Sequence, residues 1–212
     1  MPITLVISDD HAVVRKGIIS MLAGSDVQVV AEARNGHEAV ELVLQHRPDI
    51  ILMDIRMADM DGLEALEKIR EQGVTETRAV ILSTYDNPTY VARAVALGAS
   101  DYILKDCDRE QLLEAIRRVA AGQAPPDASL YGHIRKIMTR RQEETVKDLP
   151  LTIREVQVLR HIALGLSNRE IGLSLDISVE TVKEHVQNIL RKIDATDRTQ
   201  AAVWAVKRQL VS

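Results

Sequence analysis

The sequence predicts an α/β domain with a doubly wound, five-stranded parallel sheet, followed by a small all-α domain of four helices. Two observations favour the α/β domain. Short apolar runs alternate with amphipathic stretches over the first 122 residues, and two of those runs are almost wholly apolar. A third observation favours the helical domain, because from residue 151 onward apolar residues recur at helical spacing behind capping residues.

The elements of the α/β domain follow one another as five strand–helix repeats. Strands are predicted at 3–8, 27–33, 50–54, 79–83 and 101–104. Helices are predicted between and after them, near 11–23, 36–46, 62–72, 88–97 and 108–121. The pairs Asn35 with Glu38 and Asp108 with Gln111 match or resemble the spacing of a capping box, which marks the start of two of these helices.

The middle of the chain is predicted to be a linker. The breaker stretch GQAPPD starts at residue 122, and polar and charged residues follow it. A helix near 128–146 is compatible with its pattern. We therefore divide the chain into a first domain at 1–122, a linker at 123–147 and a second domain at 148–212.

Four helix starts are marked in the second domain. Capping boxes open the first two helices, at Thr152 with Glu155 and at Ser167 with Glu170, and Ser178 and Asp197 are expected to cap the third and fourth. The third helix has an apolar stripe of Val182, Val186, Ile189, Leu190 and Ile193. Its opposite face is polar, so we expect one face to pack inward and the other to face solvent.

Charge is divided unevenly along the chain, whose net charge is −4. Residues 1–122 hold 13 Lys and Arg against 20 Asp and Glu, a net charge of −7, whereas residues 151–212 hold 9 against 7, a net charge of +2. This asymmetry indicates two different tasks. A charge of +2 is by itself a weak sign of nucleic-acid binding.

The sequence favours a cytoplasmic protein that does not enter a membrane. No apolar run is long enough to span a bilayer, and the first residues lack the pattern of a signal peptide. Cys107 is the single cysteine, so it cannot form a disulfide within the chain, which is typical of a reducing compartment.

The carboxyl ends of the predicted strands carry a charged cluster. Carboxylates come from Asp9 and Asp10 after the first strand and from Asp54 at the end of the third, while Ser83 ends the fourth strand and Lys105 follows the fifth. Ligands of an open parallel sheet bind beyond these ends. Crowded carboxylates need a cation, and oxygen ligands favour Mg²⁺. Lys105 and Ser83 can hold the oxygens of a phosphoryl group.

Residues 3–121 resemble the receiver domain of bacterial response regulators. The resemblance is carried by SDD at 8–10, LMDIRM at 52–57, DGLEAL at 61–66, ILS at 81–83 and GASDYILK at 98–105. It implies a flavodoxin-like receiver fold in which a sensor histidine kinase phosphorylates Asp54. Lys105 would be the phosphate-binding lysine.

The same resemblance implies roles for the neighbouring residues. Asp10 would bind Mg²⁺ directly and Asp9 through water, and the backbone carbonyl of Arg56 would be a further ligand. Ser83 and Tyr102 would form the switch pair that responds to phosphorylation.

Two positions depart from the common receiver pattern. Where a Pro often follows the lysine, this chain has Asp106. The switch hydroxyl is commonly a Thr, but Ser83 is preferred to Thr84 because it keeps the family spacing to Lys105.

Residues 151–210 resemble the helix-turn-helix domain of the NarL/LuxR family. The motifs are LTIREVQVL at 151–159, GLSNREIG at 165–172, SVETVKEHVQNILRKI at 178–193 and DRTQA at 197–201. The resemblance implies that the helix near 178–193 enters the major groove of DNA. It also implies an ion pair between Glu155 and Arg198. Gly172 stands where the family often has Ala, and is expected to cost the helix about 1 kcal/mol.

The expected DNA contacts are of two kinds. Lys183, Glu184 and Gln187 occupy the base-reading positions of the family, and their side chains match the donors and acceptors of guanine, cytosine and adenine. The expected contacts to phosphate are Thr181, Asn168, Arg191 and Lys192.

These features predict a two-component response regulator that binds double-stranded DNA, and not an enzyme, because the phosphoryl transfer modifies the protein itself. Phosphorylation is expected to promote a homodimer and thereby sequence-specific binding. Residues 88–121 are expected to form the surface that changes, either by self-association or by masking the helical domain.

Three alternatives stay open from the residues alone. The helical domain of an adaptor would bind protein in place of DNA. A small phosphatase or α/β hydrolase would use the same carboxylates, but the sequence offers no acid or base beyond the receiver set. A ligand-sensing LuxR-type regulator would need an apolar cavity where this chain has an acidic cluster.

Overall fold

The computed structural model describes residues 1–139 and 149–211 of this 212-residue chain. The chain divides into two compact units. The first comprises Met1–Asp86 with Leu97–Pro126, and the second comprises Asn87–Ala96 with Asp127–Ser212. The expected domain boundary between residues 147 and 148 lies at the edge of a stretch outside the described residues.

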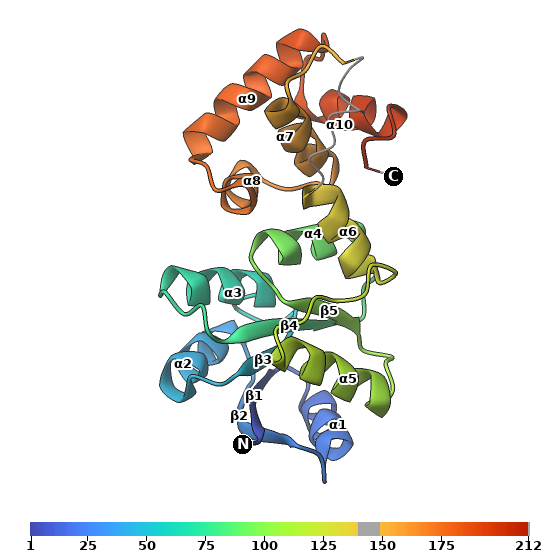
Figure 1. Cartoon of the computed structure of the whole chain (residues 1–212). Helices are drawn as coiled ribbons and strands as arrows, with labels where there is room; N and C mark the ends of the chain where they lie inside the picture. The colour runs from blue at the N-terminus through green and yellow to red at the C-terminus, as the bar shows by residue number, and fades with distance from the viewer. Residues whose placement is uncertain (140–148, 212) are drawn as a thin grey trace. The chain divides into compact units, whose positions relative to one another are not determined.

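The first unit contains a parallel sheet, as the sequence predicts (Figure 1). Its strands pair in the order β2-β1-β3-β4-β5 and all pairings are parallel. The strands are β1 (Ile3–Ser8), β2 (Val27–Ala33), β3 (Ile50–Asp54), β4 (Arg78–Ser83) and β5 (Asp101–Leu104). Every residue of β3 is buried, which explains why this central strand reads as an unbroken apolar run.

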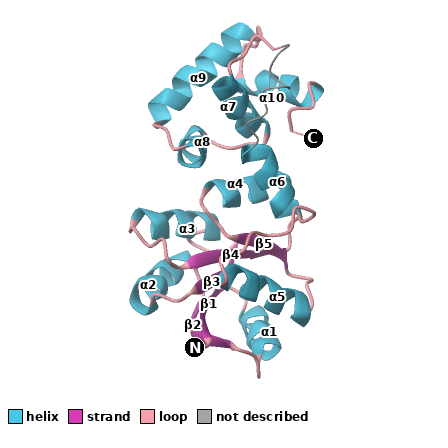
Figure 2. Ribbon diagram, viewed as in Figure 1, coloured by secondary structure: helices cyan, strands magenta, loops and turns pink. Residues whose placement is uncertain are grey.

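Helices cover both faces of the sheet, with α1 and α5 on one side and α2 and α3 on the other (Figure 2). Their bounds are α1 (Ala12–Leu22), α2 (Gly36–His46), α3 (Gly62–Glu71) and α5 (Arg109–Ala120). Leu5, Ile50 and Leu52 of the sheet pack with Ile18 of α1 and Ile116 of α5 in one apolar core. This two-sided burial fixes the strands and so fixes the residues that follow them.

The second unit is helical over its described residues. Its helices are α4 (Pro88–Ala96), α6 (Leu130–Thr139), α7 (Ile153–Ala163), α8 (Asn168–Leu175), α9 (Val179–Lys192) and α10 (Arg198–Lys207). The predicted caps are confirmed: Thr152 and Ser167 form full capping boxes with the glutamates three residues on, and Ser178 and Asp197 accept backbone hydrogen bonds at N3. The expected linker helix is present as α6, while its continuation from 140 to 146 lies outside the described residues.

Among the residues that the structure describes, no helix combines the length and the apolar character that crossing a membrane requires.

Candidate functional site

The acidic cluster lies at the carboxyl edge of the sheet, where β1 and β3 are neighbours. The chain leaves β1 toward β2 and leaves β3 toward β4, so the strand order reverses here and opens a crevice. Asp9 follows β1 and Asp54 ends β3, and their exposed fractions are only 1% and 6%. The fold thus places two buried carboxylates where sheets of this topology bind ligands.

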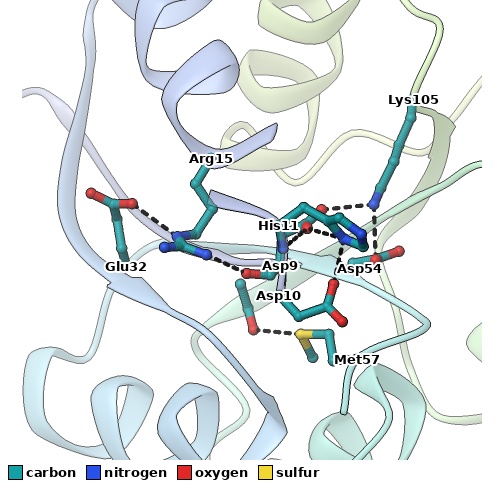
Figure 3. Close-up of polar contacts among 9 residues, drawn as sticks. Asp9, Asp10, His11, Arg15, Glu32, Asp54, Met57 and Lys105 are labelled. Atoms are coloured by element: carbon teal, nitrogen blue, oxygen red, sulfur yellow. Dashed lines mark hydrogen bonds and ion pairs between the residues drawn. The ribbon is translucent and has the colours of Figure 1, made fainter. Parts of the chain in front are cut away.

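Lys105 joins the two buried carboxylates (Figure 3). Its Nζ donates to Asp9 Oδ2 at 2.7 Å and lies 2.8 Å from Asp54 Oδ2. Burial by itself lowers the pKa of Lys105, but its hydrogen bonds to Asp54 and Asp9 outweigh burial and hold that pKa above its ordinary value. Burial raises the pKa of Asp54, and Lys105 offsets only part of that rise. Lys105 therefore stays an ammonium group beside the carboxylate.

Asp10 is the most exposed of the three carboxylates. Its side chain is partly exposed, and its Oδ1 lies 2.6 Å from His11 Nδ1. One oxygen or nitrogen ligand each from Asp9, Asp10 and His11 falls within 4.8 Å of the others. The carboxylates of Asp9, Asp10 and Asp54 outnumber the single ammonium group of Lys105, which leaves two negative charges unbalanced among them. This donor set fits a hard divalent cation.

Gly62 lets the loop after β3 close on the end of the strand. The loop returns so that Gly62 N–H donates to Ile55 O at 2.8 Å. A Cβ at position 62 would lie 1.9 Å from the carbonyl oxygen of Asp54, which no side chain permits. The glycine of the DGLEAL motif therefore holds the geometry of the residue next to it in space.

Ser83 and Tyr102 both bond to the backbone of Tyr85. Ser83 is fully buried at the end of β4, and its Oγ accepts from Tyr85 N–H at 3.1 Å. The buried Tyr102 hydroxyl donates to Tyr85 O at 2.5 Å. Thr84, the alternative switch hydroxyl, is exposed. One residue of the loop after β4 thus connects the expected switch pair.

Sequence reasoning missed Arg15 and Glu32. Arg15 lies on the buried stripe of α1 together with Ile18 and Leu22. Its Nη1 donates to Asp9 O at 2.8 Å and its Nε to Glu32 Oε2 at 3.0 Å (Figure 3). A charged residue in register with apolar core positions was the signal that could have found it, because arginine is seldom buried without partners.

The third helix of the helical domain, α9, has the two faces that the sequence predicts. Val182 and Ile189 are completely buried on its inner side. The expected base-reading and phosphate-contacting side chains on the other side are exposed, namely Lys183, Glu184, Gln187 and Arg191. Ser178 caps this helix and also bonds Thr181, so the expected contact Thr181 is fixed at the first turn.

The expected ion pair between Glu155 and Arg198 is wrong. Lys192 Nζ bonds both carboxylate oxygens of Glu155, at 2.8 and 2.7 Å, while Arg198 donates to Asn168 Oδ1 at 2.9 Å and to Leu166 O. Burial alone raises the pKa of Glu155, but the bonds from Lys192 and Thr152 outweigh it and lower that pKa. The last turn of α9 reaches the start of α7, so a lysine neutralises the buried carboxylate.

Close packing explains why position 172 holds a glycine. A Cβ at this position of α8 would lie 2.8 Å from the carbonyl oxygen of Ile177, in the turn that leads to α9. Ile177 N–H also donates to Gly172 O at 3.0 Å. The turn therefore approaches the helix too closely for alanine. The expected cost of glycine in helix propensity accompanies this tight turn.

Two family models match the chain. The response regulator receiver domain matches residues 5–117, and the bacterial regulatory proteins of the luxR family match residues 149–205.

Similar proteins span nearly the whole chain. The response regulator protein VraR of Staphylococcus saprophyticus is 39% identical over 212 residues and covers 100% of both chains. The nitrate/nitrite response regulator protein NarL of Escherichia coli (strain K12) is 36% identical over 211 residues, covering 99% of this chain and 97% of its own. The transcriptional regulatory protein YhcZ of Bacillus subtilis is 41% identical over 208 residues, 97% of this chain and 96% of its own.

Solved structures give the same result. The response regulator ChrA of a heme-sensing two-component system covers 99% of both chains at 31% identity and a TM-score of 0.53. The signal receiver domain of NarL from Mycobacterium tuberculosis covers 57% of this chain and 98% of its own, at 36% identity and a TM-score of 0.55.

Proposed function

This chain belongs to the two-component response regulators of the NarL/LuxR type, which join a receiver domain to a LuxR-type DNA-binding domain, and we propose that phosphorylation of Asp54 controls its binding to DNA. The observation that carries this proposal is Lys105, whose ammonium group joins the buried carboxylates of Asp9 and Asp54 at 2.7 and 2.8 Å. We assign residues 1–122 to the receiver, 123–147 to the linker and 148–212 to the DNA-binding domain.

The proposed reaction is transfer of a phosphoryl group from a phosphohistidine of a sensor kinase. An oxygen of Asp54 attacks phosphorus, the bond between phosphorus and the donor imidazole breaks, and the imidazole nitrogen keeps the electron pair. Lys105 offsets the charge on the transferred oxygens. Mg²⁺, held by Asp10, Asp54 and the Arg56 carbonyl and through water by Asp9, would supply further charge neutralisation. Water later hydrolyses the acyl phosphate, so the signal decays.

The switch is proposed to work through Tyr85. In the resting arrangement, Tyr85 N–H donates to Ser83 Oγ and Tyr85 O accepts from the Tyr102 hydroxyl. A phosphoryl group on Asp54 offers a charged acceptor to which the Ser83 hydroxyl can donate a hydrogen bond. When the Ser83 hydroxyl turns toward it, the Tyr85 N–H loses this acceptor, the loop at Tyr85 shifts, and Tyr102, which is bonded to Tyr85 O, changes its position with the loop. A phosphate far from DNA must act through such a conformational equilibrium.

The readout is proposed to be a homodimer, with residues 88–121 as the surface that changes. Two DNA-binding domains held together occupy half-sites about one helical turn apart. Linking them raises the effective concentration of the second domain, so two weakly binding domains give tight binding together. This suits a domain with a net charge of only +2. A protein that binds the bacterial chromosome works in the cytoplasm, which is our proposed location.

Phosphorylation should raise the dimer population and the affinity for specific DNA together. Ser83→Ala should still be phosphorylated but should form fewer dimers, because the link from the phosphoryl group to Tyr85 is lost. Analytical ultracentrifugation beside DNA titrations, on resting protein and on protein treated with acetyl phosphate and Mg²⁺, measures both. Thr84→Ala is the matched control, since this neighbouring hydroxyl is exposed. Tight DNA binding by a monomer, equal with and without phosphate, would contradict the mechanism.

The outward face of α9 is proposed to read the DNA sequence. Lys183, Glu184 and Gln187 would contact base edges, and Arg191, Thr181 and Asn168 the phosphates. Lys192 was expected among the phosphate contacts, but its ammonium group bonds the buried Glu155, so we propose that it acts mainly by holding α9 against α7.

Lys183→Ala and Gln187→Ala should each weaken specific binding by about 1–3 kcal/mol, because each removes hydrogen bonds to a base. Arg191→Ala should weaken all sequences alike and reduce the salt slope of binding by about one. Binding-site selection and salt titrations measure these effects. Lys207→Ala serves as a control, because it removes one positive charge from an exposed position on another helix, α10. Unchanged sequence preference in the first two variants would rule out direct reading by them, and no DNA binding at all would favour the adaptor.

A further inference from the structure

Arg15 holds the backbone of the acidic turn, which is formed by Asp9 and Asp10 after β1. Its exposed fraction is 8%, although it is an arginine on a surface helix. Nη1 donates to the carbonyl oxygen of Asp9 at 2.8 Å in a buried hydrogen bond, and Nε donates to Glu32 Oε2 at 3.0 Å (Figure 3). The guanidinium group thus connects α1, β2 and the turn that follows β1.

Each polar group of Asp9 then has a partner. Its N–H donates to Ala33 O at 3.2 Å and its carbonyl accepts from Arg15. Its Oδ1 accepts from His11 N–H at 2.8 Å, and its Oδ2 accepts from Lys105. Both the peptide and the carboxylate of Asp9 are therefore fixed. Without Arg15, a buried carbonyl would lose its donor, and the turn would have to shift to find another.

The charge of Arg15 is balanced where it lies. Glu32 takes the Nε hydrogen bond and forms an ion pair with the guanidinium group. Arg15 therefore orients the Asp9 carbonyl through a hydrogen bond from its guanidinium group. Because Glu32 balances its charge, Arg15 does not leave an unpaired positive charge that would repel a cation. Lys105, by contrast, forms ion pairs with the carboxylates of Asp9 and Asp54 themselves.

We infer that Arg15 is a positioning residue that sets the affinity of the acidic turn, Asp9 and Asp10, for its divalent cation. The inference rests on the proposed function, in which these carboxylates hold Mg²⁺. Groups that orient metal ligands without touching the metal change metal affinity about 10–100-fold when they are removed.

The test measures cation binding by the full chain, apart from any transfer of phosphate. Free Mn²⁺ is followed by electron paramagnetic resonance, and Mg²⁺ is titrated in competition. Arg15→Met should weaken both cations about tenfold or more, because the carbonyl of Asp9 loses its donor. Arg15→Lys should be intermediate, since an ammonium group can reach one of the two acceptors. Glu32→Gln keeps the hydrogen bond from Arg15 to Asp9 but leaves the charge of Arg15 unbalanced, so it should weaken cation affinity to a smaller extent than Arg15→Met does.

Arg70→Met is the matched control. Arg70 is a half-buried arginine that also donates to backbone carbonyls, at Val74 O and Thr77 O, but these lie at the opposite edge of the sheet, before β4. This variant should lose stability in urea unfolding while its cation affinity stays that of the wild type. A second readout is phosphorylation by acetyl phosphate, which Arg15→Met should slow at low Mg²⁺ and recover at saturating Mg²⁺.

The outcomes separate this inference from the function on which it rests. If Arg15→Met loses stability as Arg70→Met does but binds Mn²⁺ with wild-type affinity, Arg15 is only structural and the inference is overturned. If Arg15→Met does not fold, the affinity of Arg15→Lys decides in the same way. If the wild-type chain binds neither cation and is not phosphorylated, the proposed function itself fails.

Discussion

Replacing Asp54 by alanine is expected to abolish phosphorylation completely while leaving the protein folded. The carboxylate oxygen of Asp54 is the proposed nucleophile, and alanine puts no oxygen in its place. The neighbouring Asp9 carboxylate is already held by His11 N–H and Lys105. The fold should survive because burial disfavours the ionised form of Asp54, as its raised pKa indicates, so its removal takes away an unfavourable buried charge. Lys105 also keeps Asp9 as a partner. Phosphate-affinity gels after treatment with acetyl phosphate and Mg²⁺ measure the modified fraction.

Asp86→Ala is the control for this experiment. Asp86 belongs to the loop after β4 but is exposed, so its loss should leave the phosphorylated band at full strength. Urea unfolding of both variants checks that the fold is kept. A full band shift in Asp54→Ala would mean that another residue is the acceptor.

Acid should destabilise the helical domain before its carboxylates are protonated, because of His161. The side chain is completely buried in α7, where Nδ1 lies 2.8 Å from Gln157 O and Nε2 lies 2.8 Å from Ser174 Oγ. Burial lowers the pKa of His161 from 6.5 to about 4, against the hydrogen bond to Gln157 and with smaller contributions from the nearby Arg154 and Arg160. The ring is therefore neutral in the fold, donating from Nδ1 and accepting from Ser174.

The sign of the pH effect follows from the depressed pKa. The unfolded chain takes up a proton on His161 near pH 6.5, while the folded chain resists until about pH 4. The stabilising contribution is therefore fully present above pH 6.5 and is lost as the pH falls toward 4. The expected loss is about 3 kcal/mol in the free energy of unfolding. Fluorescence of Trp204, the single tryptophan of the chain, reports urea unfolding of this domain at each pH.

Two variants separate His161 from other acid effects. His161→Gln should remove the pH dependence between 6.5 and 4.5, whatever its effect at neutral pH. His185→Gln, in which the side chain reaches the surface of α9, should retain it. Below about pH 4.5, protonation of Glu155 adds a loss of its own, because its pKa is lowered in the fold. An equally steep pH dependence in His161→Gln would disprove the assignment.

The secondary structure and the members of the acidic cluster can be predicted from the amino-acid sequence. Strands such as IILMD at 50–54 follow from local apolar patterning, and helix starts such as Thr152 and Ser178 follow from capping, which acts over three or four residues. Because parallel strands end at one edge, their sequence positions predict that Asp9, Asp54 and Lys105 meet there, and in the structure they do.

The partner that each buried charge takes depends on how the helices and strands pack, and the sequence alone does not predict it. Glu155 pairs with Lys192 and not with Arg198, because the choice depends on how α7 and α9 cross, and sequence spacing carries no measure of that distance. Arg15 shows its role only once β2 brings Glu32 beside α1 and the turn of Asp9 closes over both. Local patterns act along the chain, whereas hydrogen bonds to a buried group are chosen by proximity in space, and that proximity exists only in the folded chain.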